Sequence, residues 1–210
     1  SEILSQGWQD TEFLRANTEA PFLVKDDNSF LRMSDLGVAP TTTVNAQGKE
    51  VVVDPEVVWD EATQSARSHQ EAERPALEGI PAEVEGFAVR PVWGMMVDAI
   101  SEWTPERAAE IAQVDADDIR AIAELLGTNG PVGMKIGLGP GCMHTNAIQN
   151  GRAIACLQGL LGWIDVPGGV NVPVAFSVML DDKITLWDSA KDPGRPDLFT
   201  FGGEKHPLYK

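Results

Sequence analysis

The sequence predicts an α/β fold, and three observations support this prediction. Short apolar runs separated by turn-forming residues recur in the N-terminal third, which is typical of β-hairpins. Apolar residues recur at helical spacing between residues 92 and 126. Residues 134–169 read as a short apolar strand, a glycine-rich turn, a helix and a second glycine-rich turn. The order strand, turn, helix is typical of the parallel sheets of α/β proteins.

Residues 1–85 form the first predicted part, with one helix and two hairpins. The helix is expected over 10–19 and is opened by Asp10, and the hairpins turn at 25–28 and at 45–48. Residues 60–79 are polar and charged, with few large apolar groups. We therefore expect an exposed helix or a mobile loop there.

Residues 86–170 are predicted to form the α/β core. Residues 92–103 fit a buried helix, Thr104 and Pro105 open a second helix, and Asp115 caps a third. A parallel strand is expected over 132–139 and a long helix over 147–161. Two tryptophans, Trp93 and Trp163, and the thiol of Cys156 are expected in the core.

Residues 171–210 form the third predicted part, an extended tail. An apolar run is followed by a stretch rich in Pro, Gly and charge. Such a tail rarely forms a core of its own. We expect it to pack on parts that are missing from this chain.

The composition excludes several classes of function. A net charge of −16 argues against a nucleic-acid surface and against docking on anionic membranes, which need clustered Lys and Arg. No apolar run approaches the roughly 20 residues that span a bilayer, and no signal peptide is visible. The chain is expected to be soluble, and the two cysteines leave the compartment open between cytoplasmic and exported.

The turn Gly137-Leu138-Gly139-Pro140-Gly141 is the strongest candidate site. Glycines let a phosphate or a flat heterocycle approach backbone amides without a Cβ in the way. The dinucleotide fingerprint G-x-G-x-x-G fails because Cys142 occupies the third glycine position. From the local pattern alone, a plain structural turn and a cofactor turn both stay open.

Cys142 and His144 are close enough to suggest a nucleophile with its base, or two metal ligands. Each interpretation requires at least one further group, and none is identifiable in the sequence. His144 is better interpreted as a polar residue that lines a pocket or caps the following helix.

Three motifs in the same order resemble the molybdopterin oxidoreductase family, also called the dimethyl sulfoxide reductase family. They are DTEFLRANTEAPFLVKDD at 10–27, TPERAAEIAQVDADDIRAIAELL at 104–126, and IGLGPGCMHTNAIQNGRAIACLQGLLGWIDVPGGVN at 136–171. The likeness covers residues 10–36 and 86–210. The iD.PGG form is most similar to the acetylene hydratase, transhydroxylase and catechol dehydroxylase-like branch.

The resemblance implies a bis-molybdopterin guanine dinucleotide cofactor with molybdenum or tungsten. It implies that this region is a partial Rossmann-like dinucleotide-binding domain with a parallel sheet and flanking helices. Gly137, Leu138 and Gly139 would lie against a pterin or its pyrophosphate, with Cys142, His144 and Asn146 nearby. The turn from Gly162 to Gly169 would shape the rim of the pocket.

The resemblance also implies that the chain is an internal piece of a larger catalytic polypeptide. The metal ligand and any iron–sulfur cysteines of the family precede the matched region. We therefore expect the isolated chain to be inactive and to lack the cofactor. Its partners would be the remaining domains of the same polypeptide and an electron-transfer subunit. Two alternatives stay open, a free-standing nicotinamide- or flavin-binding domain and a non-catalytic acidic interaction module.

Overall fold

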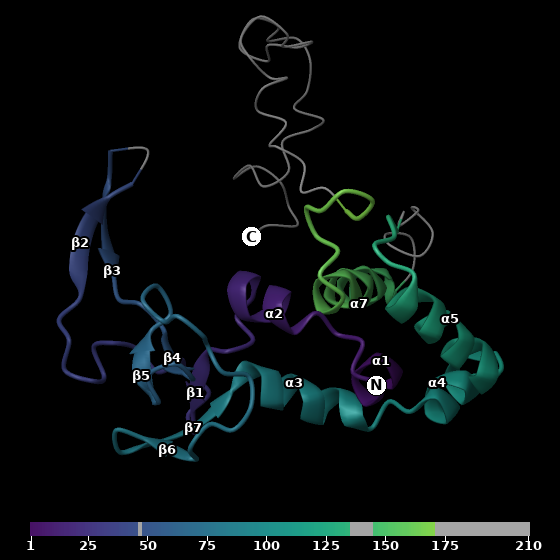
Figure 1. Cartoon of the computed structure of the whole chain (residues 1–210), viewed down its shortest axis with the longest axis horizontal. Helices are drawn as coiled ribbons and strands as arrows, with labels where there is room; N and C mark the ends of the chain where they lie inside the picture. The colour runs from purple at the N-terminus through teal and green to yellow at the C-terminus, as the bar shows by residue number, and fades with distance from the viewer. Residues whose placement is uncertain (46–47, 135–144, 171–210) are drawn as a thin grey trace, which may run out of the picture. The chain divides into compact units, whose positions relative to one another are not determined.

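The computed structural model describes residues 1–45, 48–134 and 145–170 (Figure 1). The chain divides after Asn171, so all described residues belong to one unit. They mix short antiparallel sheets in the N-terminal half with helices in the C-terminal half. The predicted tail at 171–210 lies outside the described residues.

Three small sheets contain every strand of the described residues. β1 (Leu23–Lys25), β7 (Phe87–Pro91) and β6 (Glu83–Val84) form one sheet in that order; β2 (Thr41–Val44) pairs with β3 (Glu50–Val53), and β4 (Val57–Asp60) pairs with β5 (Ser65–Ser68). All of these pairings are antiparallel.

The predicted parallel sheet is therefore not found among the described residues. Three of the strand pairs, β2–β3, β4–β5 and β6–β7, are joined by short turns, and a short turn connects only antiparallel neighbours. The single parallel contact in the described part is an isolated bridge between Ile164 and Val170. Most of the predicted parallel strand, residues 135–139, lies outside the described residues.

Both predicted N-terminal hairpins are confirmed. In the first, the Lys25 N–H donates to Ser29 O over 2.8 Å and the turn places Asn28 at φ 65°, a conformation that asparagine tolerates. Its second arm makes only an isolated bridge, between Val24 and Phe30. In the second hairpin, Thr41 faces Val53 across four paired positions.

The prediction of an exposed helix or mobile loop over residues 60–79 is wrong in part. The segment contains strand β5 and a loop that is tied to Asp60, a fully buried residue. The Asp60 carboxylate accepts hydrogen bonds from the N–H groups of Ala62 and Arg74 and from the Thr63 hydroxyl. A single buried carboxylate thus orders a polar stretch that hydropathy alone assigns to solvent.

The helices begin and end close to the predicted positions. They are α1 (Glu2–Ser5), α2 (Thr11–Asn17), α3 (Val92–Ser101), α4 (Pro105–Ala112), α5 (Ala116–Thr128) and α7 (Ala147–Leu160). Asp10 and Thr104 cap α2 and α4 through their side chains, as predicted. Asp115 stands at the N-cap of α5, but its side chain makes no capping hydrogen bond.

Three apolar clusters hold these elements together. The first lies among the strands around Leu23, Leu31 and Val57. The second joins α1, α5 and the end of α7 around Trp163, and the third joins α2 and α3 around Trp93. Both tryptophans are buried, which confirms their predicted place in the core.

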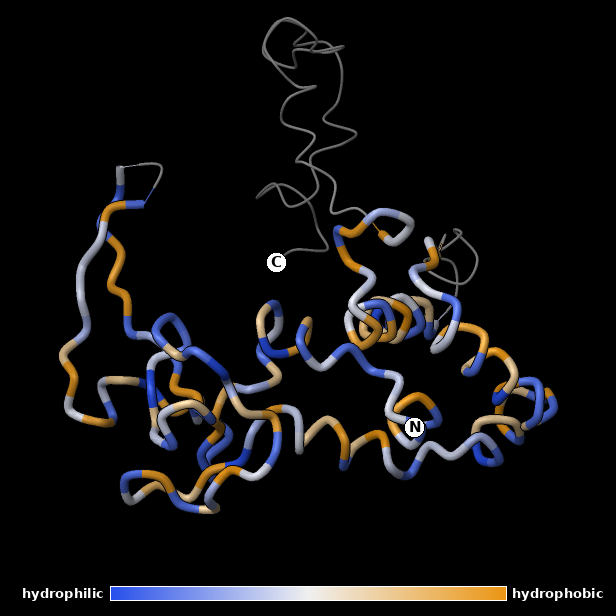
Figure 2. Tube along the Cα trace, viewed as in Figure 1, coloured by the Kyte–Doolittle hydropathy of each residue, from blue (hydrophilic) through white to orange (hydrophobic). Residues whose placement is uncertain are grey.

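Hydrophobic residues also lie outside these clusters, as the colouring of Figure 2 shows along the β2–β3 hairpin and along α5. None of the helices in the described ranges has the length and apolar character that crossing a membrane requires.

Candidate functional site

Only one of the six predicted cofactor residues lies among the described residues. Gly137, Leu138, Gly139, Cys142 and His144 lie outside them, between Met134 and Thr145. Asn146 is described and exposed, and it stands at the N-cap of α7. The flanks of the predicted loop therefore define the candidate site.

The start of α7 differs from the starts of α2 and α4. Those helices carry an acidic residue in the first turn, and the side chains of Asp10 and Thr104 accept from the N–H groups of Phe13 and Arg107. The first turn of α7 has no acidic residue, and Asn146 makes no capping hydrogen bond. The Asn146 amide instead donates to the Asn150 side chain at 3.4 Å.

A helix start of this kind is suited to an anion. The first N–H groups of any helix lack intrahelical partners, and the helix dipole adds a partial positive charge there. Because no carboxylate of the first turn competes, a phosphate-type group is compatible with the N-terminus of α7. The residues present on this flank therefore fit the anionic part of a nucleotide cofactor.

The second glycine-rich turn, residues 162–169, folds back on itself. The Asp165 N–H donates to Val170 O over 2.7 Å, and the Val170 N–H donates to Trp163 O over 2.8 Å. A Cβ on Gly169 would lie 2.1 Å from the Trp163 carbonyl oxygen, so only glycine fits there. The turn is thus a tightly closed backbone loop anchored on the buried Trp163 ring.

This turn lies against the strand-side flank of the predicted loop. A Cβ on Gly133 would be 3.4 Å from the carbonyl oxygen of Gly169, and one on Gly168 would be 3.4 Å from the Pro131 ring. Met134 packs on the cluster that contains Trp163. The chain that enters the predicted loop and the second glycine turn are therefore held side by side, as the sequence motif suggested.

A depression of about 490 Å³ adjoins this contact. Its lining combines two tryptophans, several glycines and a single charged side chain, namely Trp8, Asp10, Leu126, Gly127, Thr128, Gly130, Pro131, Leu161, Gly162, Trp163, Val166 and Pro167. Asp10 reaches this lining because its carboxylate lies against Gly162, where a Cβ would be only 2.5 Å from Oδ2.

The contact of Asp10 with Gly162 was not predicted from the sequence. The pattern identified Asp10 only as a helix cap, and its partner lies at the opposite end of α7 in a distant motif. The two motifs that share the family resemblance meet at this point. Their co-occurrence in the sequence is the signal from which their proximity was available.

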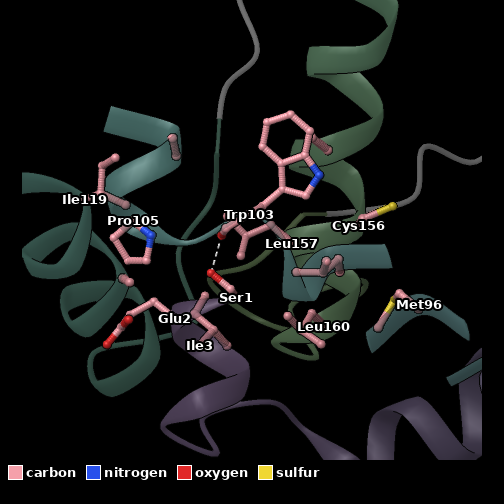
Figure 3. A pocket seen from close by; sticks show the side chains of 14 residues that line it. Ser1, Glu2, Ile3, Met96, Trp103, Pro105, Ile119, Cys156, Leu157 and Leu160 are labelled. Carbon is pink, nitrogen blue, oxygen red and sulfur yellow. Dashed lines mark hydrogen bonds between the residues drawn. The ribbon is translucent and has the colours of Figure 1, made fainter. Parts of the chain in front are cut away.

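A separate apolar cavity of about 480 Å³ lies among α1, α3, α4, α5 and α7 (Figure 3). Trp103, Leu157 and Leu160 line it, and the Ser1 hydroxyl donates to the Trp103 carbonyl oxygen at its edge. This lining offers no glycine and few polar groups, so it does not suit a phosphorylated cofactor.

Cys156 lines this apolar cavity and is exposed. Its prediction as a core residue is therefore wrong. The helix periodicity of α7 placed it near the buried face, but the side chain opens onto the cavity instead of packing.

Within the described ranges, no group of three or more His, Cys, Asp or Glu side chains is arranged to hold a metal ion. Any metal therefore needs ligands from outside the described residues, as the family resemblance expects.

The chain is similar to parts of several oxidoreductases. It is 28% identical to a component of the sulfite dehydrogenase of Allochromatium vinosum over 80% of this chain and 20% of that protein. It is 35% identical to dopamine dehydroxylase of Eggerthella lenta over 64% of this chain and 14% of that protein. An uncharacterized oxidoreductase of Eggerthella lenta is 34% identical over the same shares.

No protein-family model matches the chain. The chain spans about a fifth or less of the length of these curated relatives. The names of the relatives support an oxidoreductase context, and the matched region is in each case a small part of the relative.

Proposed function

We propose that this chain is a cofactor-binding part of a larger molybdopterin-dependent oxidoreductase. The observation that carries the proposal is the start of α7. It follows the predicted loop directly and combines an uncapped helix N-terminus, free of first-turn carboxylates, with a glycine turn packed on the other flank.

The relatives support the same assignment. The sulfite dehydrogenase component and the dopamine dehydroxylase both carry out redox chemistry by their names, and the second agrees with the dehydroxylase-like branch that the iD.PGG motif suggested. Bound molybdenum or tungsten, held by bis-molybdopterin guanine dinucleotide, would supply that chemistry.

The residues of this chain would bind and orient the cofactor. Gly137, Leu138 and Gly139 would present backbone N–H groups to a pterin or its pyrophosphate. The start of α7 at Asn146 would add further donors, with Cys142 and His144 nearby. The closed turn at 162–169 would form a rigid rim, because its backbone is anchored on buried Trp163.

The rest of the enzyme would come from outside this chain. The strand predicted at 132–139 would complete a parallel, Rossmann-like sheet with strands of the remaining domains. The sulfite dehydrogenase relative is named as one of several components of its enzyme. We accordingly propose that a separate electron-transfer protein is a further partner.

Metal and nucleotide analysis of two proteins tests the proposal. The longer protein that contains this chain, purified anaerobically, is expected to hold molybdenum or tungsten and guanine nucleotide in stoichiometric amounts. Gly139→Val in that protein is expected to lower both contents about tenfold or more, because a side chain blocks the backbone surface. Gly151→Ala, at an open position of α7, is the matched control and retains them.

The isolated 22.7 kDa chain is expected to hold neither metal. A stoichiometric metal content in the isolated chain would contradict the proposal. Tight binding of NAD or FAD to the isolated chain, measured by calorimetric titration, would favour the free-standing nucleotide binder instead.

A further inference from the structure

Helix α5 carries an open apolar groove on its surface. The groove encloses about 390 Å³ and is lined by Val114, Asp118, Ile119, Ala121, Ile122 and Leu125. We call it the α5 groove. It is distinct from the candidate cofactor site, whose lining contains none of these residues.

The large side chains of the α5 groove are unusually exposed. Val114, Ile122 and Leu125 are 50%, 57% and 58% exposed. Ile122 and Leu125 are three residues apart and follow Asp118 by four and seven, so they form one stripe along the helix. A contiguous apolar stripe of this kind typically marks an interaction surface.

The opposite face of α5 already has its packing partners. Ala123 is buried in the cluster with Ile3 and Trp163, and Leu126 packs on the same cluster. The α5 groove is therefore a second apolar face, left over after the helix has been anchored within the described part of the chain.

The charges around the α5 groove are acidic. Asp118 lies in the lining, Asp117 and Glu124 are exposed on the same helix, and Asp115 precedes it. The single cation of α5, Arg120, is engaged by Glu106 and by Asp117. The groove thus combines an apolar floor with an unbalanced negative rim.

We infer that the α5 groove binds an amphipathic segment of the longer polypeptide, from outside residues 1–210. The segment presents an apolar ridge flanked by lysine side chains. Apolar contact supplies affinity and charge complementarity selects the orientation. This inference rests on the proposed function for the existence of the longer polypeptide, since the relatives are at least five times as long as their matched part.

Zero-length cross-linking of the longer protein tests the inference. A carbodiimide joins a carboxylate to a lysine amine that is in direct contact with it. We expect links from Asp117, Asp118 or Glu124 to lysines outside residues 1–210, identified by peptide mass spectrometry. Links only to lysines within residues 1–210, of the same or of a second copy, would overturn the inference.

Two variants of the longer protein give the test a matched control. Asp118→Lys reverses a charge in the groove and is expected to reduce the yield of these links at least about fivefold. Asp26→Lys makes the same change in the exposed turn of the first hairpin and is expected to leave the yield unchanged. An equal yield in both variants would contradict the role of the negative rim.

The apolar floor is tested with Ile122→Asp. Because Ile122 is exposed, the isolated chain is expected to keep its thermal midpoint and its circular dichroism spectrum. The longer protein is expected to lose the cross-links and to melt at a lower temperature. A lower midpoint in the isolated chain as well would show that Ile122 stabilises this chain itself, and would overturn the inference.

The outcomes separate this inference from the proposed function. Stoichiometric metal without external cross-links overturns the α5 groove alone. External cross-links in a longer protein that holds no molybdenum or tungsten support the groove and overturn the proposed function.

Discussion

Asp60 shows how a single residue organises a segment that the sequence pattern misassigned. Burial raises the pKa of its carboxyl, but the N–H groups of Arg74 and Ala62 and the hydroxyl of Thr63 outweigh this effect and leave the pKa below 3.8. The ionised carboxylate is therefore the form that the folded chain prefers. Its partners are 2, 3 and 14 residues away, so it fastens the far end of the 60–79 segment to strand β4.

Asp60→Asn is expected to lower the free energy of unfolding by about 1–3 kcal/mol at pH 7, since the amide group meets N–H donors with a donor of its own. A group whose folded pKa is depressed adds stability above its unfolded pKa and loses it as the pH falls through the folded pKa. The difference between wild type and variant should thus narrow below pH 3.8.

Urea unfolding of both proteins between pH 7 and pH 3 measures this difference. Asp26→Asn, in an exposed turn, is the control and should change the free energy of unfolding by less than about 0.5 kcal/mol. A difference for Asp60→Asn that stays constant down to pH 3 would mean that the ionised carboxylate is not what holds the segment.

At the scale of elements, local signals predicted most of the helices and the first two hairpins. Asp10 and Thr104 cap their helices as their residue types suggest, and the turn around Asn28 follows from turn chemistry. The third hairpin, β4–β5, escaped prediction because its register depends on the buried contacts of Asp60, which are formed across the turn and with Arg74.

The candidate site was predictable in its setting but not in its contacts. The sequence predicted a helix after the loop and a closing turn at 162–169, and both flanks are found. The approach of Gly133 to Gly169 and of Asp10 to Gly162 depends on long-range packing, which periodicity does not encode. The glycine loop and the parallel strand lie outside the described residues and stay predictions.

Two helical glycines predict opposite effects of the same substitution. A Cβ on Gly127 of α5 would be 2.5 Å from the Trp8 ring, whereas a Cβ on Gly151 of α7 would meet no atom within 4 Å. Gly127→Ala is expected to destabilise the chain by about 1–3 kcal/mol through overpacking. Gly151→Ala is expected to stabilise it by about 0.5–1 kcal/mol, because alanine loses less backbone entropy.

Chemical denaturation of the two variants beside the wild type measures both effects. If the two substitutions change the free energy of unfolding in the same direction, the contact of α5 with Trp8 does not form in solution. The Trp8 fluorescence change in Gly127→Ala gives an independent readout of that contact.

At the scale of the whole molecule, a net charge of −16 accompanies exposed apolar surface. Within the described residues this surface includes Val44 and Val52 of the β2–β3 hairpin and the stripe of the α5 groove. At neutral pH the charge keeps copies of the chain apart, although the apolar faces favour contact. The balance between these two effects depends on the titration of the carboxylates.

The isolated chain is therefore expected to reach its lowest solubility close to its isoelectric point of 4.4. Replacing Ile122 and Leu125 by serine should raise the solubility at that pH by about twofold or more, because the α5 groove then offers less apolar surface for contact between copies. Static light scattering across pH 7 to 3.5 measures the effect. Replacing Leu23, which is fully buried, serves as no control because it would unfold the chain, so the exposed pair Thr41 and Thr43 to serine is used instead. If the threonine variant gains as much solubility as the groove variant, association near the isoelectric point does not depend on the α5 groove, and its exposed stripe is not the surface through which copies meet.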